Sequence, residues 1–198
     1  METEIQLESL TGAAIETALL SLARLRIEVF YAFPYLYDGD MAYEASYLRV
    51  LGEARDNLIV VARTGEQMVG CATGSALDGH HDAFAAPLKA HGIDPESCFY
   101  CGESVLLPGY RGRGIGHAFF DHREAHARAR GYQYSCFCAV IRPEDHPMKP
   151  ADYSPLDGFW QKRGYRKLDG AVATFSWKDI GEAAETDKQM QVWLRELS

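Results

Sequence analysis

The sequence predicts one α/β (α+β) domain over residues 1–198, and three observations lead to this fold class. Short apolar runs typical of strands are interspersed with longer segments whose apolar residues recur at helical spacing. Two such runs, separated by a Thr-Gly-Glu turn, predict a β-hairpin at residues 57–77. The chain has 198 residues and 47% hydrophobic content, which is ample for one sizeable core.

The first part of the chain predicts two helices between strands. The expected elements are a strand over residues 1–10, helices over 12–33 and 41–54, and strands over 57–63 and 67–77. Ile5 and Leu7 alternate with polar neighbours as in a strand, whereas the next two segments have helical spacing. Asp40 is suited to cap the second helix. Gly70 within the second hairpin strand indicates a bulge or a bend.

The second part predicts an alternation of strands and helices around a long loop. The expected elements are a strand over 98–107, a helix over 114–130, a strand over 133–140, a short helix over 155–163 and a strand over 171–178. Residues 78–97 are interpreted as an insertion or extended hairpin connection with a short helix. Four prolines make residues 142–157 a loop, and Gly164 is expected to end the short helix. Residues 190–196 fit either a helix or a strand.

The composition restricts the function classes. A net charge of −8 and a pI near 5.3 argue against a nucleic-acid-binding protein, which is usually basic. The same charge weakly favours a cationic substrate. The sequence shows no signal peptide and no apolar run of membrane-spanning length. We therefore expect a cytoplasmic protein without nucleic-acid or membrane partners.

The cysteines and histidines do not predict a metal site. The odd number of cysteines indicates reduced thiols at Cys71, Cys98, Cys101, Cys136 and Cys138. Their C-x-x-C and C-x-C pairs could supply four thiolates to zinc, but both pairs lie in expected strands, where buried cysteines act as small hydrophobes. His122 and His126 lie one helical turn apart, yet HREAH lacks the glutamate of H-E-x-x-H, and we expect both to face solvent.

A glycine-rich turn after a strand carries the main functional signal. The apolar run Val105, Leu106 and Leu107 is stopped by a Pro-Gly pair. The turn that opens the next helix reads Arg111, Gly112, Arg113, Gly114, Ile115 and Gly116. Glycines permit close backbone approach, and the unpaired amides and dipole of the helix start attract anions such as phosphate. His117 occupies the third glycine position of the dinucleotide fingerprint, and no Walker A sequence is present.

This turn resembles the pyrophosphate-binding motif of the GNAT superfamily of N-acetyltransferases, Gln/Arg-x-x-Gly-x-Gly/Ala. Residues 159–165 (FWQKRGY) resemble the second signature of the family, in which an aromatic pair precedes a basic residue, a glycine and an aromatic. The resemblance implies a mixed, mostly antiparallel central sheet of about six to seven strands flanked by about four helices. It also implies a C-terminal β-hairpin at about 171–197, so residues 190–196 are interpreted as a strand.

The resemblance further implies transfer of an acetyl group from acetyl-CoA to a primary amine by direct attack in a ternary complex. Glu103 is the expected general base, because burial of a carboxylate disfavours its charged form. The alternative is that Glu103 is a solvated charge at the strand edge or pairs with an arginine. The amide of Leu106 or Val105 is expected to polarise the thioester carbonyl. The residues expected to contact the cofactor are Val105, Leu106, Leu107, Arg111, Gly112, Arg113, Gly114, Ile115, Gly116 and Trp160. Trp160 stands where many relatives have a tyrosine that acts as the general acid, and Tyr153 is the candidate general acid in its place.

The acceptor is not specified by any motif. A small-molecule or peptide amine is expected. A dense set of aromatic residues could line its pocket, with packing in the core as the alternative for about half of them: Tyr31, Phe33, Tyr35, Tyr37, Tyr43 and Tyr47. Two alternatives stay open. One is a non-catalytic acyl-CoA-binding sensor or interaction domain on the same fold, and the other is a nucleotide-phosphate enzyme that uses the glycine turn. Symmetry statistics favour a homodimer.

Overall fold

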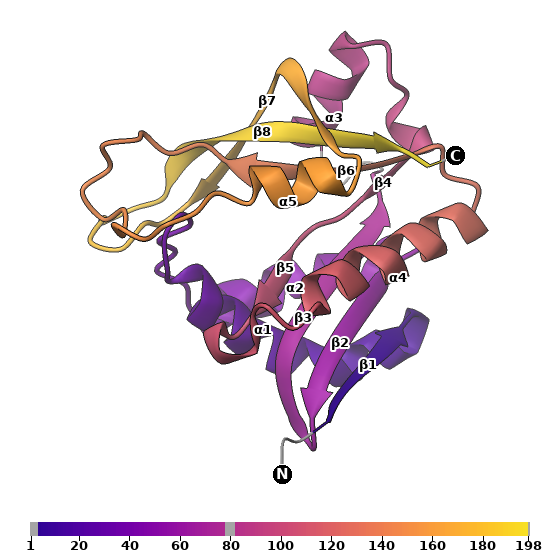
Figure 1. Cartoon of the computed structure of the whole chain (residues 1–198), viewed down its shortest axis with the longest axis horizontal. Helices are drawn as coiled ribbons and strands as arrows, with labels where there is room; N and C mark the ends of the chain where they lie inside the picture. Colours follow the sequence, from indigo (N-terminus) through magenta and orange to yellow (C-terminus); the bar gives the residue numbers. More distant parts are fainter. Residues whose placement is uncertain (1–3, 78–81, 198) are drawn as a thin grey trace.

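A mixed sheet of eight strands organises the chain (Figure 1). The computed structural model describes residues 4–77 and 82–197. The strands are β1 (Ile5–Leu10), β2 (Leu58–Thr64), β3 (Gln67–Ala76), β4 (Cys98–Tyr100), β5 (Ser104–Leu106), β6 (Tyr134–Val140), β7 (Arg166–Trp177) and β8 (Thr186–Glu196). The helices are α1 (Glu16–Phe30), α2 (Met41–Glu53), α3 (Asp82–Ala90), α4 (Ile115–Ala129) and α5 (Asp157–Lys162), with 3-10 turns at Gly12–Ile15, Pro95–Ser97 and Pro108–Tyr110.

The sheet divides where β5 and β6 separate. Its strand order is β1-β2-β3-β4-β6-β8-β7, and β5 pairs with β3. Among the described strands, only β4 and β6 pair in parallel. β5 continues along β3, whereas β6 continues along β8, so the two halves diverge after the short β4–β6 contact. Figure 1 shows β6, β8 and β7 crossing the upper half and β1, β2 and β3 the lower half.

Helices cover both faces of this sheet. Buried residues of α1, α2 and α3 belong to one hydrophobic cluster, and those of α4 belong to another. Within β2, Ile59 and Val61 contact the first cluster, whereas Leu58, Val60 and Ala62 contact the second. Successive strand residues point to opposite faces, which explains why residues 58–62 of β2 are apolar without interruption. The mixed, mostly antiparallel α/β fold expected from the sequence is confirmed.

A β-bulge breaks the strand that the sequence predicted as continuous over residues 98–107. The Gly102 amide donates to the Thr73 carbonyl at 3.2 Å, and the Thr73 amide donates to the Glu103 carbonyl at 3.0 Å. Two residues therefore oppose one, which shifts the pairing by one position between β4 and β5. Arg123 of α4 holds the bulge, because its guanidinium donates to the Thr73 carbonyl at 3.3 Å and the Glu103 carbonyl at 3.0 Å.

Several local expectations agree with the structure. The Asp40 carboxylate accepts hydrogen bonds from the Ala42 and Tyr43 amides and so caps α2. The β2–β3 register shifts beside Gly70, as expected for a bulge. Gly164 ends α5 in the left-handed conformation, with a φ of 86°. No helix within residues 4–77 or 82–197 combines the length and apolar character needed to cross a membrane.

Other expectations need correction. The expected helix over 12–33 begins with a 3-10 turn, and β7 and β8 begin several residues earlier than expected. His122 and His126 are half-buried rather than solvent-facing: they lie 2.8 Å from the Ser9 hydroxyl and 3.0 Å from the Asp56 carbonyl, respectively.

All five cysteines are buried free thiols. Within the described residues, no three His, Cys, Asp or Glu side chains gather closely enough to hold a metal ion.

Candidate active site

The glycine-rich turn forms an open amide cradle at the start of α4. Gly112 and Gly114 have φ values of 75° and 81°, a region that residues with a side chain rarely adopt. The first helical hydrogen bond runs from the Ala118 amide to the Gly114 carbonyl at 3.1 Å. The amides of the residues between them precede this bond and have no partner within the helix. Residues 111–114 are exposed, so the cradle is accessible to an anion.

Arginine side chains next to the cradle supply positive charge, and helix α5 packs against the start of α4 behind it. The Arg111 guanidinium donates to the Leu106 carbonyl at 3.4 Å, which places its positive charge between β5 and the turn. The guanidinium of Arg113 lies 5.5 Å from the ring centre of Tyr110. A Cβ at Gly116 would meet Phe159 of α5 at 3.6 Å, so α5 packs directly against the start of α4. The two sequence signatures therefore meet in space.

The backbone of β5 leads from this cradle into the opening between β5 and β6. The Thr73 amide donates to the Glu103 carbonyl, and the Leu107 amide donates to the Val69 carbonyl. Antiparallel ladders alternate, so the amide of Val105 also faces β3, whereas the amide of Leu106 faces the opposite side. Of the two amides considered for the thioester carbonyl, only that of Leu106 points away from β3.

Glu103 lies beside the bulge in a buried charge cluster. One of its carboxylate oxygens, Oε2, is 2.8 Å from Nη1 of Arg26 and accepts a 3.4 Å hydrogen bond from the Tyr47 hydroxyl. Arg26 also donates to Glu44 through Nε at 2.6 Å. The other oxygen of Glu103, Oε1, is buried and has no hydrogen-bond partner in the described part of the chain. Burial alone lowers the pKa of Arg26, but the Glu103 and Glu44 carboxylates more than offset this, so its pKa is raised.

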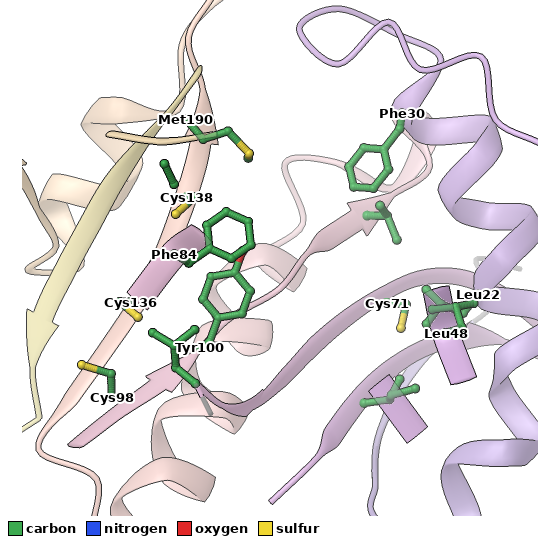
Figure 2. Packing of buried hydrophobic residues seen from close by; sticks show 14 of the residues in the cluster. Leu22, Phe30, Leu48, Cys71, Phe84, Cys98, Tyr100, Cys136, Cys138 and Met190 are labelled. Carbon is green, nitrogen blue, oxygen red and sulfur yellow. The ribbon is translucent and has the colours of Figure 1, made fainter. Parts of the chain in front are cut away.

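This cluster forms part of the lining of an aromatic pocket. The tyrosines that line the pocket come from the α1–α2 loop, α2 and β4: Tyr35, Tyr37, Tyr43, Tyr47 and Tyr100. The remaining wall is apolar and comes from α1, α3 and the C-terminal strands: Phe30, Phe84, Phe175, Trp177 and Met190. Figure 2 shows Phe84, Tyr100 and Met190 grouped together and Phe30 on the side of α1. Burial raises the pKa of Tyr35 to about 12, so this phenol stays protonated at neutral pH.

The structure supports part of the aromatic wall expected from the sequence. Four of its six residues line the pocket, but Tyr31 is exposed and Phe33 packs against Tyr153 with ring centres 4.7 Å apart. Arg26 was not expected in the site. The sequence did contain a signal for its burial. Arg26 lies four residues after Leu22 and four before Phe30, so it belongs to the apolar stripe of the helix.

Tyr153 and Trp160 lie outside this pocket lining. Tyr153 belongs to the proline-rich loop, and burial together with Asp157 raises the pKa of its phenol. Trp160 is half-buried against Phe137 and Trp193, with ring centres 4.9 and 5.1 Å apart. The cradle and Glu103 are thus joined through β5, whereas neither Tyr153 nor Trp160 contacts Glu103.

Replacing Arg26 is expected to destabilise the fold strongly. Arg26→Met would leave Glu44 and Glu103 buried without their shared cation, and breaking a buried ion pair costs about 3–5 kcal/mol. Urea denaturation followed by circular dichroism would measure the loss. Arg24→Met is the matched control, because this neighbouring arginine on α1 is exposed and its replacement is expected to change stability little. Equal stability of the two variants would contradict a structural role for the cluster.

The family follows from the sequence comparison. The Acetyltransferase (GNAT) family model matches residues 21–151, which span α1 to the proline-rich loop. This chain belongs to the GNAT acetyltransferase family. The comparison with curated protein sequences finds no matching relative.

Solved structures agree in fold over the whole chain. An N-acetyltransferase from Staphylococcus aureus Mu50 is 12% identical, with a TM-score of 0.60 over 98% of this chain and 99% of that one. A ribosomal-protein-alanine N-acetyltransferase from Brucella melitensis is 13% identical, with a TM-score of 0.60 over 97% and 99%. The PaiA N-acetyltransferase from Thermoplasma acidophilum, solved in complex with coenzyme A, is 13% identical, with a TM-score of 0.54 over 98% and 99%.

Proposed function

We propose that this protein transfers the acetyl group of acetyl-CoA to the primary amine of a small molecule. One observation carries the proposal: β5 connects the amide cradle to the aromatic pocket. The Leu106 amide, which points away from β3, and the buried carboxylate of Glu103 lie on this one segment, three residues apart. Membership of the GNAT family supports the reaction class, and the coenzyme A complex of the Thermoplasma relative supports the choice of cofactor.

The proposed cofactor site follows the chain from β5 to α4. The pyrophosphate would bind the amides of residues 112–116, with Arg111 and Arg113 adding positive charge. The pantetheine arm would lie along the backbone of Val105, Leu106 and Leu107, where the sheet opens toward β6. The Leu106 amide would donate to the thioester oxygen and stabilise the negative charge that develops there. Trp160, packed beside β6, would form part of the opposite wall.

In the proposed reaction, the amine nitrogen attacks the thioester carbonyl carbon directly. A primary ammonium has a pKa of about 10.4, so a proton must first leave. Glu103 belongs to the lining of the pocket, and its buried Oε1, which has no partner among the described residues, would accept this proton, directly or through water. The new carbon–nitrogen bond then forms, the carbon–sulfur bond breaks, and coenzyme A leaves as a thiolate. Tyr153 is the proposed proton donor to sulfur; a thiolate with a pKa of about 8.5 can also depart without one.

The second candidate function is binding of acyl-CoA without catalysis. Trp160 favours it, because indole offers no ionisable hydroxyl at the position where many family members carry a tyrosine. This candidate shares the cradle and the cofactor with the first, so the two differ only in whether an amine is acetylated.

Amine-dependent thiol release would test the proposed function. Protein, acetyl-CoA and a panel of primary amines are mixed, and free coenzyme A is followed with a thiol reagent. We expect acetyl-CoA to raise the melting temperature and at least one amine to accelerate thiol release above hydrolysis, with its N-acetylated form as the inactive control. Stabilisation without any amine-dependent release would favour the binding domain, and no stabilisation would contradict the cradle assignment.

A further inference from the structure

The charges of the aromatic pocket are unbalanced. Arg26 is shared by two carboxylates, so the buried cluster carries one net negative charge when both are ionised. The Glu103 side chain is only 4% exposed, and its Oε1 has no hydrogen-bond partner among the described residues. A buried carboxylate oxygen without a donor is costly, since burial removes the water that would otherwise solvate it. A single ligand cation at this oxygen would supply both the missing donor and the missing charge.

The rest of the pocket suits an aromatic body. Phe84 stacks between Tyr100 and Phe175, with ring centres 5.1 and 5.8 Å apart and interplanar angles of 20° and 25°. Tyr35 and Trp177 form another ring pair at 6.0 Å on the same lining. Aromatic rings bind other rings by stacking and edge contacts, and their faces also attract cations. The wall therefore favours a flat apolar group attached to a positively charged head.

The same lining disfavours two other kinds of amine. A zwitterionic amino acid would need a cation for its carboxylate, but Arg26, the only lysine or arginine of the described lining, already contacts Glu44 and Glu103. A polyamine or aminoglycoside would need several acceptors, and Glu103 is the only carboxylate of that lining. Extra cationic groups would instead meet Arg26, which repels them, or aromatic rings, whose attraction for cations offsets only part of the lost hydration.

From these contacts we propose that the acceptor is an arylalkylamine, which is a primary monoamine attached to an aromatic ring. Its single ammonium would bind Oε1 of Glu103, and its ring would pack against Phe84, Phe175 and Trp177. The inference rests on the proposed function for the reaction itself, but the binding preference can be measured without turnover. In the reaction, the amine nitrogen would lose one proton to Glu103 and bond to the acetyl carbon, while the carbon–sulfur bond breaks and coenzyme A is released.

Calorimetric titration would test the preference, with and without saturating coenzyme A. The ligands are phenethylamine, which keeps the proposed groups, 2-phenylethanol, which replaces the ammonium, and phenylalanine, which adds a carboxylate. Spermidine, an aliphatic triamine, adds cations and removes the ring. We expect phenethylamine to bind roughly tenfold to a hundredfold more tightly than the other three, the range for one charged hydrogen bond. Equal or tighter binding of spermidine or phenylalanine, or no binding of phenethylamine, would overturn the proposal.

Two variants locate the binding site. Glu103→Gln is expected to remove the preference for phenethylamine over 2-phenylethanol. Because this substitution also disturbs the Arg26 ion pair, Phe175→Leu provides a second variant at a half-buried residue outside that ion pair, whose ring contacts Phe84 and Trp177. It is expected to weaken phenethylamine about three- to tenfold through lost ring contacts. Unchanged affinity in both variants would place the amine elsewhere and overturn the proposal.

The outcome separates this inference from the proposed function. Glu103-dependent binding of phenethylamine without thiol release from acetyl-CoA for any amine would leave the binding preference intact and contradict catalysis. Thiol release with other amines, but neither binding nor turnover of phenethylamine, would leave catalysis intact and contradict the acceptor class.

Discussion

Glu103→Gln is expected to lower the rate of amine-dependent acetyl transfer about 100- to 10,000-fold, the usual contribution of a general base. The glutamine is nearly isosteric and can still donate or accept at the pocket, but it cannot take up a proton from the ammonium. Steady-state kinetics with a saturating amine would measure the change in kcat. Because the substitution replaces one carboxylate of the Arg26 cluster, the melting temperature and the affinity for acetyl-CoA should be measured on the same sample.

Glu53→Gln is the matched control for this experiment. Glu53 lies at the exposed end of α2, so the same chemical change there is expected to leave kcat and stability nearly unchanged. A Glu103→Gln protein that is folded, binds acetyl-CoA and turns over as fast as the unmodified protein would show that Glu103 is not the base.

Gly114→Asp is expected to weaken binding of acetyl-CoA about a hundredfold, as judged from the loss of charge-assisted hydrogen bonds to phosphate. The new carboxylate would stand beside the free amides at the start of α4, where it would compete for them and repel the pyrophosphate. The left-handed backbone at this position adds strain of about 1 kcal/mol for a residue with a side chain. Isothermal titration calorimetry with acetyl-CoA would measure the affinity.

Gly131→Asp separates the strain from the charge. Gly131 follows the other end of α4 with the same φ of 81°, and a Cβ at either glycine would meet open space. Both variants therefore introduce the same left-handed backbone strain, whereas only the one at the cradle is expected to lose affinity for acetyl-CoA. The carboxylate at Gly131 lies at the negative end of the helix, so the melting temperature of each variant is measured beside its affinity. Equal affinity of both variants would contradict the assignment of the turn as a phosphate site.

The sequence predicted those features that consecutive residues specify. The cradle lies within one six-residue run, and its glycines, arginines and helix start are recognisable without tertiary information. Asp40 and Gly164 similarly act on residues within one helical turn of themselves. The segment over 190–196 was ambiguous by periodicity, and its pairing with β6 and β7 decides that it is a strand.

The features that were missed depend on contacts between distant segments. The break at Gly102 and Glu103 is stabilised by Thr73 and Arg123, which bond to the backbone of the bulge. Gly102 within the strand was a local signal of the kind used at Gly70, but it does not reveal these distant partners. Arg123 itself is only 1% exposed although it lies in a charged helical sequence. The pocket wall likewise assembles from α1, α2, α3, β4 and β7, so no short window of sequence contains it.

Helix α3 has a consequence for how this protein could diversify. It connects β3 to β4, contacts β7 and places Phe84 between two other rings of the wall. The proposed cofactor cradle contains no residue of α3. Inherited changes in this one connection can therefore reshape the wall of the pocket while the residues between Leu106 and Gly116 stay untouched. Different segments of the chain therefore form the wall of the pocket and the proposed cofactor cradle, so the acceptor preference can change without a change in the proposed cofactor site.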